Sequence, residues 1–366
     1  MTDNQRTPPS RRDQAAPRPV HVDPALFVAG ARVGRYTVER RLGAGAMSEV
    51  YLAVDESLGR RAAIKVLGSK QFGNSTLRER FLREARALAR LSHPNLIPIF
   101  EAGETSTHPA RPYYAMELLE GGDTHKLLDE RGPLPGPVVA LIGAQAAMGL
   151  GEAARAGIIH RDVKPANLGI SRHGVLKVTD FGLAKSYSME KSLTGRGMVV
   201  GTADYIAPEQ ARGEELDERA DVYSLGCTLF HLLTGHPPYQ ATPGPMVKEY
   251  LEVMRMHLSA PVANAKAEIP DADQELCGLI SLMMVKDREN RPTFAELAPK
   301  LARIAGRLGG ELPRMTRQLF LVSTESGPVV STPLELRNPA LKSWPKYTVL
   351  AAIAIALGVG IFLLSR

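Results

Sequence analysis

The apolar and polar positions of this chain predict strands in its first third and helices in most of the remainder. Alternating apolar and polar side chains over residues 36–42 and 49–55 predict two half-buried strands, and residues 62–66 and 113–119 are predicted as two more. Two glycines lie between the first two strands. Strand, glycine turn and strand predict a hairpin whose tip could close over phosphate groups, although a plain turn would give the same pattern.

Helical periodicity begins at Arg78, where apolar side chains recur every three or four residues as far as Leu91. A long Ala-rich stretch over residues 138–156 predicts a second helix, and the pattern is again helical from Pro292 to Ile304. The chain thus has a region of strands with one helix, followed by a region of helices. This order predicts an α+β fold.

The two ends of the chain differ from this patterned region, which covers residues 34–305. Residues 1–33 are rich in Pro and polar side chains, so they have too little apolar surface to offset chain entropy and are expected to be disordered. They lack the apolar run of a signal peptide, which predicts that the N-terminus stays in the cytoplasm. Residues 306–346 contain five prolines and are expected to form a flexible juxtamembrane linker.

Residues 347–364 are 18 consecutive positions without a charged side chain. As a helix they would span about 27 Å, close to a hydrocarbon thickness of about 30 Å, so we predict a single transmembrane helix rather than a buried core helix. Lys342 and Lys346 precede it, which places its start on the cytoplasmic side of the inner (cytoplasmic) membrane. Small residues at every fourth position of the helix could pair two chains, although frequent alanines alone would give the same spacing.

The formal net charge of +6 does not come from the patterned region. Residues 34–305 contain 33 Lys or Arg and 33 Asp or Glu, so the excess of basic residues lies in the tails. A nucleic-acid-binding domain would concentrate basic residues on its folded surface, and no nucleic-acid partner is therefore expected. Cys227 and Cys277 are far apart and lack metal-binding spacing, which indicates two reduced thiols in a cytosolic core.

The densest chemistry lies in two short segments, His-Arg-Asp-Val-Lys-Pro-Ala-Asn from residue 160 and Asp-Phe-Gly from residue 180. They supply a candidate base in Asp162, a fixed cation in Lys164, and oxygen ligands for a hard metal ion in Asn167 and Asp180. Phosphoryl transfer from ATP needs these groups, because most of the work is aligning a hydroxyl and neutralising phosphate charge. Loop-capping polar residues would not give four chemically matched groups in one register.

These segments resemble the catalytic loop and the metal-binding loop of protein kinases. Over residues 34–305 the chain resembles a Hanks-type (eukaryotic-like) bacterial serine/threonine protein kinase of the membrane-anchored kind. The resemblance implies a two-lobed fold, with a small β-rich lobe that has one main helix and a larger, mostly helical lobe. It also implies transfer of the γ-phosphoryl group of ATP to Ser or Thr hydroxyls of protein substrates, with Mg²⁺ or alternatively Mn²⁺ as cofactor.

The resemblance further implies the nucleotide contacts. Lys65 is expected to hold the α- and β-phosphates and to form an ion pair with Glu84, although a solvated Glu84 on an Arg-rich helix is the alternative. Met116 is expected to limit the depth of the adenine pocket. Asp123 lies where the family often has an acid near the ribose, and a helix cap is an equal alternative. The remaining expected contacts are Leu42, Gly43, Gly45, Val50, Ala63, Glu117, Leu119 and Asn167.

Residues 183–200 are expected to form an activation loop. A phosphate on Thr194, or on Ser192, would bind Arg161 and order the loop through charge-assisted hydrogen bonds. Thr202 is expected to contact the base and the cation of the catalytic loop and to help define a hydroxyl-bearing peptide. Two paired chains, a homodimer in the membrane, would phosphorylate this loop in trans.

Two structural roles follow from the same resemblance: Glu209 and Arg291 are expected to form a buried ion pair, and Asp221 to brace the catalytic-loop backbone. Two other functions are weighed against the kinase. An inactive scaffold with the same fold is disfavoured because the catalytic groups are all present, although Ser48 replaces a third loop glycine. A small-molecule phosphotransferase is disfavoured because residues 201–209 resemble a peptide-docking platform.

Overall fold

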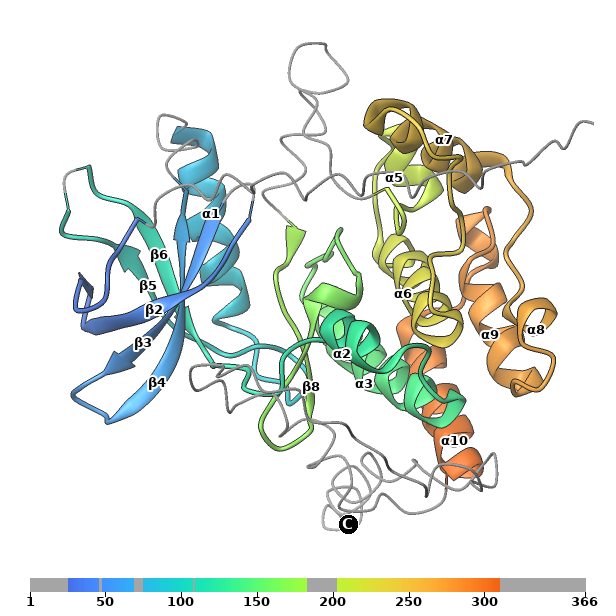
Figure 1. Ribbon diagram of the computed structural model, residues 1–366, viewed down its shortest axis with the longest axis horizontal. Helices are drawn as coiled ribbons and strands as arrows, with labels where there is room; N and C mark the ends of the chain where they lie inside the picture. The colour runs from blue at the N-terminus through green and yellow to red at the C-terminus, as the bar shows by residue number, and fades with distance from the viewer. Residues whose placement is uncertain (1–25, 46–47, 69–74, 108, 183–202, 310–366) are drawn as a thin grey trace, which may run out of the picture.

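The computed structural model describes residues 26–45, 48–68, 75–107, 109–182 and 203–309. These residues form a small lobe, built on a β-sheet with one helix, and a larger, mostly helical lobe (Figure 1). The α+β, two-lobed prediction is confirmed for this part of the chain. The predicted transmembrane helix and its linker, and most of the predicted N-terminal tail, lie outside the described residues.

The small lobe contains one antiparallel sheet in the order β1-β2-β3-β4-β6-β5. Its strands are β1 (Arg32–Val33), β2 (Tyr36–Ala44), β3 (Ser48–Asp55), β4 (Arg60–Leu67), β5 (Ile99–Glu104) and β6 (Pro112–Met116). Lys65 on β4 pairs with Val50 of β3 and with Tyr114 of β6, so it lies on a central strand. The strand predicted to run to Leu119 ends at Met116. Leu118 and Leu119, whose apolar side chains suggested a longer strand, lie beyond its end and pack against the apolar cluster of the small lobe.

The two faces of this sheet are covered by different segments. One face buries Tyr51 and its neighbours under residues 26–31, where Phe27 meets the Tyr51 ring edge-on at 5.6 Å between ring centroids. Residues 26–33, which were predicted to belong to the disordered tail, are therefore part of the small lobe, because Leu26 and Phe27 are apolar and pack against the sheet. The other face packs against α1 (Ser75–Leu88), which starts and ends three residues earlier than predicted.

The large lobe consists of helices around one apolar core, with a short hairpin where it meets the small lobe. Its helices are α2 (Thr124–Arg131), α3 (Gly136–Arg155), α5 (Pro208–Arg212), α6 (Glu218–Thr234), α7 (Met246–Ser259), α8 (Ala265–Glu268), α9 (Gln274–Met283) and α10 (Phe294–Gly309). The 3-10 turns are η2 (Pro165–Asn167) and η4 (Arg288–Asn290), and the hairpin strands are β7 (Leu168–Ile170) and β8 (Leu176–Val178).

Helix α3 is the centre of the large lobe. Two of its glycines allow close packing, since a Cβ atom at Gly143 would lie 2.8 Å from Leu229 of α6 and one at Gly151 would lie 3.1 Å from Phe294 of α10. Among the helices that the structure describes, α3 alone has the length and apolar composition of a membrane span, and most of it is buried in this core. Its C-terminal end delivers the chain to the catalytic loop.

Candidate active site

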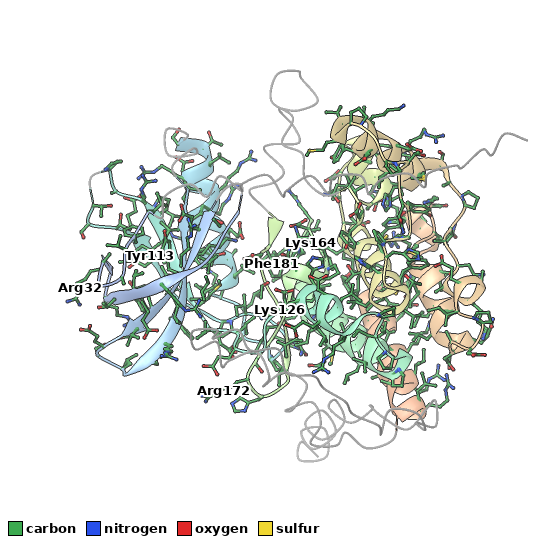
Figure 2. The ribbon with its side chains drawn as sticks, in the orientation of Figure 1. Arg32, Tyr113, Lys126, Lys164, Arg172 and Phe181 are labelled. Atoms are coloured by element: carbon green, nitrogen blue, oxygen red, sulfur yellow. The ribbon has the colours of Figure 1, made fainter. Side chains whose placement is uncertain are left out.

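The catalytic loop lies between the sheet and the helical lobe, where Figure 2 labels Lys164 and Phe181. Its backbone is fixed by Asp221 of α6, whose carboxylate accepts hydrogen bonds from the N–H of His160 at 2.6 Å and from the N–H of Arg161 at 2.8 Å. This is the bracing role predicted for Asp221. Burial raises the pKa of Asp221 to about 7, although the two N–H donors favour its charged form.

His160 joins the catalytic loop to the metal-binding loop. Its ring is fully buried, stacks near Phe181 at 4.4 Å, and lies with Nε2 2.8 Å from the carbonyl oxygen of Thr179. Burial lowers the pKa of His160, so the ring is neutral at pH 7. Because a carbonyl oxygen only accepts, Nε2 bears the hydrogen and Nδ1 accepts the N–H of Asp162 at 3.2 Å.

Asp162, the candidate base, is held by two of the other predicted residues. Lys164 Nζ lies 3.2 Å from its Oδ2, and Asn167 Nδ2 donates to the same oxygen at 3.0 Å and to the Asp162 carbonyl at 2.7 Å. A Cβ atom on Gly182 would lie 3.0 Å from Cβ of Asp162. A larger residue at position 182 would therefore have to displace the metal-binding loop or Asp162 by a few tenths of an ångström.

Lys65 reaches the site from the small lobe and pairs with Asp180 at 2.8 Å between Nζ and Oδ1. Burial alone would lower the pKa of Lys65, but the carboxylate of Asp180 outweighs it and raises the value well above 10.5. Burial would likewise raise the pKa of Asp180, and the charge of Lys65 lowers it instead. Both side chains are therefore charged, and Asp180 is in the left-handed backbone region with φ of 53°.

Glu84 does not form the expected ion pair here, because no Glu84 oxygen lies within 4.0 Å of Lys65 Nζ among the described contacts. Its side chain is nevertheless buried, with 3% exposure, so the solvated alternative is also wrong. Burial raises the pKa of Glu84 to about 8, and Lys65 offsets only part of that rise. Glu84 is thus mostly protonated at pH 7 while Asp180 is the partner of Lys65.

Four of the expected nucleotide-binding residues lie in one apolar cluster on the face of the sheet that packs against α1. Ala63 and Met116 are buried in it, with Val50 and Leu119 packed against them. The N–H of Glu117 donates to the carbonyl of Pro98 at 3.2 Å. In the described structure the carbonyl of Glu117 and the N–H of Leu119 have no hydrogen-bond partner, so the predicted contact of both groups with an adenine edge stays a prediction.

The other predicted residues have varied placements. Asp123 caps α2, because its Oδ1 accepts the N–H of Lys126 at 2.9 Å. Gly43 lies on β2, where the neighbouring Leu42 is exposed, and the N–H of Gly45 bonds the carbonyl of Ser48 at 2.8 Å. The activation-loop candidates Thr194 and Ser192, and the peptide contact Thr202, lie outside the described residues.

The predicted pair of Glu209 and Arg291 is present and buried. Arg291 donates from its two terminal nitrogens to the two Glu209 oxygens, at 2.6 and 2.9 Å, and its remaining donors bond backbone carbonyls. This joins the Ala-Pro-Glu segment at the start of α5 to the turn η4.

The donor set fits a magnesium ion. Both Asn167 N–H bonds go to oxygens of Asp162, one of them a carbonyl that only accepts, so the amide orientation is fixed and Oδ1 is the free ligand atom. The Asp180 carboxylate is the second oxygen donor. Two oxygen donors are typical of Mg²⁺ bound together with phosphates, whereas Zn²⁺ sites use His and Cys.

Gly169, the middle residue of β7, was not among the residues predicted for the site. A Cβ atom on it would lie 2.2 Å from Cδ1 of Leu119, so this strand touches the segment that joins the lobes. A signal was present, since a glycine inside a strand often marks the close approach of another group. The direct contact of Lys65 with Asp180, which depends on the placement of three distant segments, was not predicted either.

Comparison with known proteins matches residues 36–300 to the model of the protein kinase domain. The chain is 37% identical over 257 residues to serine/threonine-protein kinase PknL of Mycobacterium tuberculosis, covering 70% of this chain and 62% of that protein. It is 37% identical over 283 residues to serine/threonine-protein kinase PknB of Mycobacterium leprae, covering 77% and 44%. The chain thus matches under two thirds of the length of these curated relatives.

Among solved structures, the crystal structure of the Mycobacterium tuberculosis PknI kinase domain is similar, with a TM-score of 0.59 and 30% identity. The similarity covers 76% of this chain and 99% of that one.

Proposed function

The chain belongs to the protein kinase family, and we propose that it is an ATP-dependent serine/threonine protein kinase. The observation that carries the proposal is the set of contacts around Asp162, whose carboxylate lies against Lys164 and Asn167. The same loop is bonded to the segment that bears Asp180, because the N–H of Gly182 donates to the carbonyl of His160 at 2.7 Å. These contacts hold Asp162, Lys164, Asn167 and the segment of Asp180 together, which supports their proposed roles as base, cation and metal ligands.

Each of these side chains has a role in the proposed transfer. The Asp162 carboxylate orients the substrate hydroxyl and accepts its proton. Lys164, beside it, supplies a fixed positive charge for the transferred group. Asn167 Oδ1 and the Asp180 carboxylate would hold Mg²⁺, and Mg·ATP when bound supplies the phosphoryl group and most of the neutralising charge.

Lys65 would change its partner when nucleotide binds. In the described arrangement its charge is neutralised by Asp180, whereas a metal at Asp180 would compete for that carboxylate. Lys65 would then be free for the phosphates, and the buried Glu84 would ionise beside it. The expected Lys65–Glu84 pair would thus form by exchange of the Lys65 partner from Asp180 to Glu84.

The test is phosphoryl transfer from labelled Mg·ATP by the full chain in detergent, to itself and to a generic basic protein. We expect transfer to Ser and Thr, and Asp162→Asn should reduce it by at least about 100-fold while nucleotide still binds. Nucleotide binding by wild type without any transfer would indicate the inactive scaffold. Transfer to small alcohols but not to proteins would indicate the small-molecule phosphotransferase.

We also propose a signalling role at the inner membrane, with the kinase lobes in the cytoplasm and residues 347–364 as the single span. The apolar sequence of that segment supports this. Homodimers would phosphorylate the activation loop in trans at Thr194 or Ser192. Recovery of the full chain in the soluble fraction without detergent would contradict the span, and mass spectrometry that finds no phosphate between residues 186 and 202 would contradict the autophosphorylation.

A further inference from the structure

Any residue could adopt the backbone conformation of Gly169. The side chain of Leu119, however, lies in the space into which a side chain at position 169 would extend. The φ of Gly169 is outside the left-handed region, so the conformation does not require glycine. A Cβ atom there would lie 2.2 Å from Cδ1 and 3.6 Å from Cγ of Leu119, and at an ordinary 3.5 Å from Thr179. The side chain of Leu119 therefore occupies the space that a β7 side chain would take.

Leu119 is held in this place by its own segment. Two backbone bonds tie the following residues to β7: the N–H of Ile170 donates to Gly122 at 2.9 Å, and the N–H of Gly121 donates to Ile170 at 3.1 Å. Gly121 is needed for this approach, since a Cβ atom there would lie 2.8 Å from the Ile170 carbonyl. The contact of Leu119 with Gly169 is thus fixed by the paired backbone of the residues that immediately follow them.

This contact lies between the groups expected to bind the two ends of a nucleotide. Gly169 follows Asn167 by two residues, and Thr179 immediately precedes Asp180, so the metal ligands are on one side. The unbonded N–H of Leu119 is on the other. The Leu119 side chain also packs in the same cluster as Val50 and Ala63 of the small lobe.

We propose that Leu119, and not a side chain of β7, forms the apolar surface under the adenine ring, and that Gly169 is the gap that admits it. The base would lie between Leu119 and the small-lobe residues Val50 and Ala63, with the Leu119 N–H at its edge. Leu119 and Gly169 would then be one specificity-determining pair for the purine. This inference rests on the proposed ATP-dependent function.

The opposite role for Leu119 is a plug that fills the base site and must move away. The two roles predict opposite changes in affinity when the side chain is shortened. If Leu119 forms the apolar surface under the base, shortening its side chain leaves a void there and weakens nucleotide binding. If Leu119 fills the base site, shortening its side chain strengthens nucleotide binding.

The experiment titrates the full chain with Mg·ADP in detergent and compares Leu119→Ala, Gly169→Leu and the double variant. Each single variant should bind about tenfold more weakly, one through a void and the other through displacement of Leu119. In the double variant the new leucine fills the void under the base, so its affinity should return to within about threefold of wild type. KM for ATP should follow these changes, while kcat changes little.

Gly103→Ala, a strand glycine on β5 where a Cβ atom would have an ordinary contact of 3.4 Å, is the matched control and should bind like wild type. Melting temperatures without nucleotide show whether each variant is folded, and Gly169→Ala replaces Gly169→Leu if that variant is unfolded. Unchanged or tighter binding by Leu119→Ala, or additive losses in the double variant, overturns the inference while wild-type binding leaves the proposed function standing. No binding by wild type overturns both.

Discussion

Glu84 shows at the scale of one residue how a buried carboxyl depends on which cation is near it. It is as buried as the core residues around it, and burial raises its pKa to about 8, since the charge of Lys65, which is paired with Asp180, offsets only part of that rise. The same side chain beside a released Lys65 would be an anion. The protonation state of Glu84 therefore depends on whether Lys65 is paired with Asp180 or with Glu84.

Glu84→Gln should separate stability from activity. The folded pKa of about 8 lies above the ordinary 4.5, so the folded state retains a proton that the unfolded state loses between these values, and stability from this group falls as pH rises from 4.5 to 8. Glutamine cannot ionise, so the variant should melt at a higher temperature than wild type at pH 8.5 relative to pH 5. Its transfer rate should fall at least about tenfold, because Lys65 has no second anionic partner.

The matched control is Glu79→Gln, an exposed acid on the same helix. Its melting difference from wild type should be the same at both pH values. A Glu84→Gln variant that loses relative stability on going from pH 5 to pH 8.5 would contradict the protonated, buried carboxyl.

At the scale of elements, the segment before β1 is part of the small lobe. The N–H of Phe27 donates to the hydroxyl of Tyr51 at 3.2 Å, and that hydroxyl donates to Glu49 at 2.5 Å. Phe27→Ala keeps the backbone N–H but removes the buried ring that packs edge-on against Tyr51, so it should cost about 3 kcal/mol of unfolding free energy, measured by urea titration. Val28→Ala is the control, because Val28 is 74% exposed and should change little. Equal stability of the two variants would show that the segment does not hold the sheet.

The buried guanidinium of Arg291 fixes the start of α5 to η4. Arg291→Lys should cost about 3 kcal/mol in urea unfolding, because an ammonium group lacks the planar fork that reaches both Glu209 oxygens and leaves a buried charge poorly paired. Arg288→Lys, a partly exposed neighbour on η4, should change stability by less than about 0.5 kcal/mol. Similar losses in the two variants would argue against a special role of the buried pair.

Elements with strong local patterns were predictable and weak ones were not. The strands β2 and β3 alternate side chains along a half-buried surface, so their existence follows from sequence alone. β7 and β8 have three residues each, too few for a period, and β5 has little burial contrast along it. The end of β6 was missed because Leu118 and Leu119 look like a strand and are in fact packing residues of the connection.

At the scale of the whole molecule, the lobes are joined by more than the connecting segment. Asn95, in the turn after α1, donates from its amide to Gln145 of α3 at 3.1 Å and to the Leu176 carbonyl at 2.9 Å. Its own carbonyl accepts the N–H of Val178 at 2.9 Å, two residues before Asp180. The turn that follows the helix of Glu84 is therefore bonded to the large lobe close to Asp180.

These contacts explain why part of the site could be predicted and part could not. Asp162, Lys164 and Asn167 lie within six residues of each other, so their spacing alone implied that they meet. The partner of Lys65 depends on where α1 and the Asp180 loop lie relative to β4, which no local pattern contains. The gap at Gly169 likewise depends on a side chain 50 residues earlier in the chain.

The buried His257 makes the stability of the large lobe depend on pH. His257 is fully buried with Nδ1 2.9 Å from the Tyr223 hydroxyl, and burial, with the nearby Lys286, lowers its pKa to about 3. The unfolded state takes up a proton near pH 6.5, so this stability is complete above pH 6.5 and is lost as pH falls towards 3, at about 1.4 kcal/mol per pH unit. Asp221 and Glu84, with raised pKa values, act in the opposite direction, so a variant is needed to isolate the histidine.

His257→Gln removes this titration and keeps a polar side chain of similar reach. The variant should be less stable than wild type at pH 7.5, because the packed ring is lost, and the difference should shrink by about 1.4 kcal/mol for each pH unit below 6.5. Urea titrations at pH 7.5, 6.0 and 5.0 measure it. His173→Gln, at an exposed position after β7, should show a difference that does not change with pH. A His257→Gln difference that stays constant over this range would mean that His257 takes up a proton in the folded lobe as readily as in the unfolded chain, which contradicts a pKa lowered by burial.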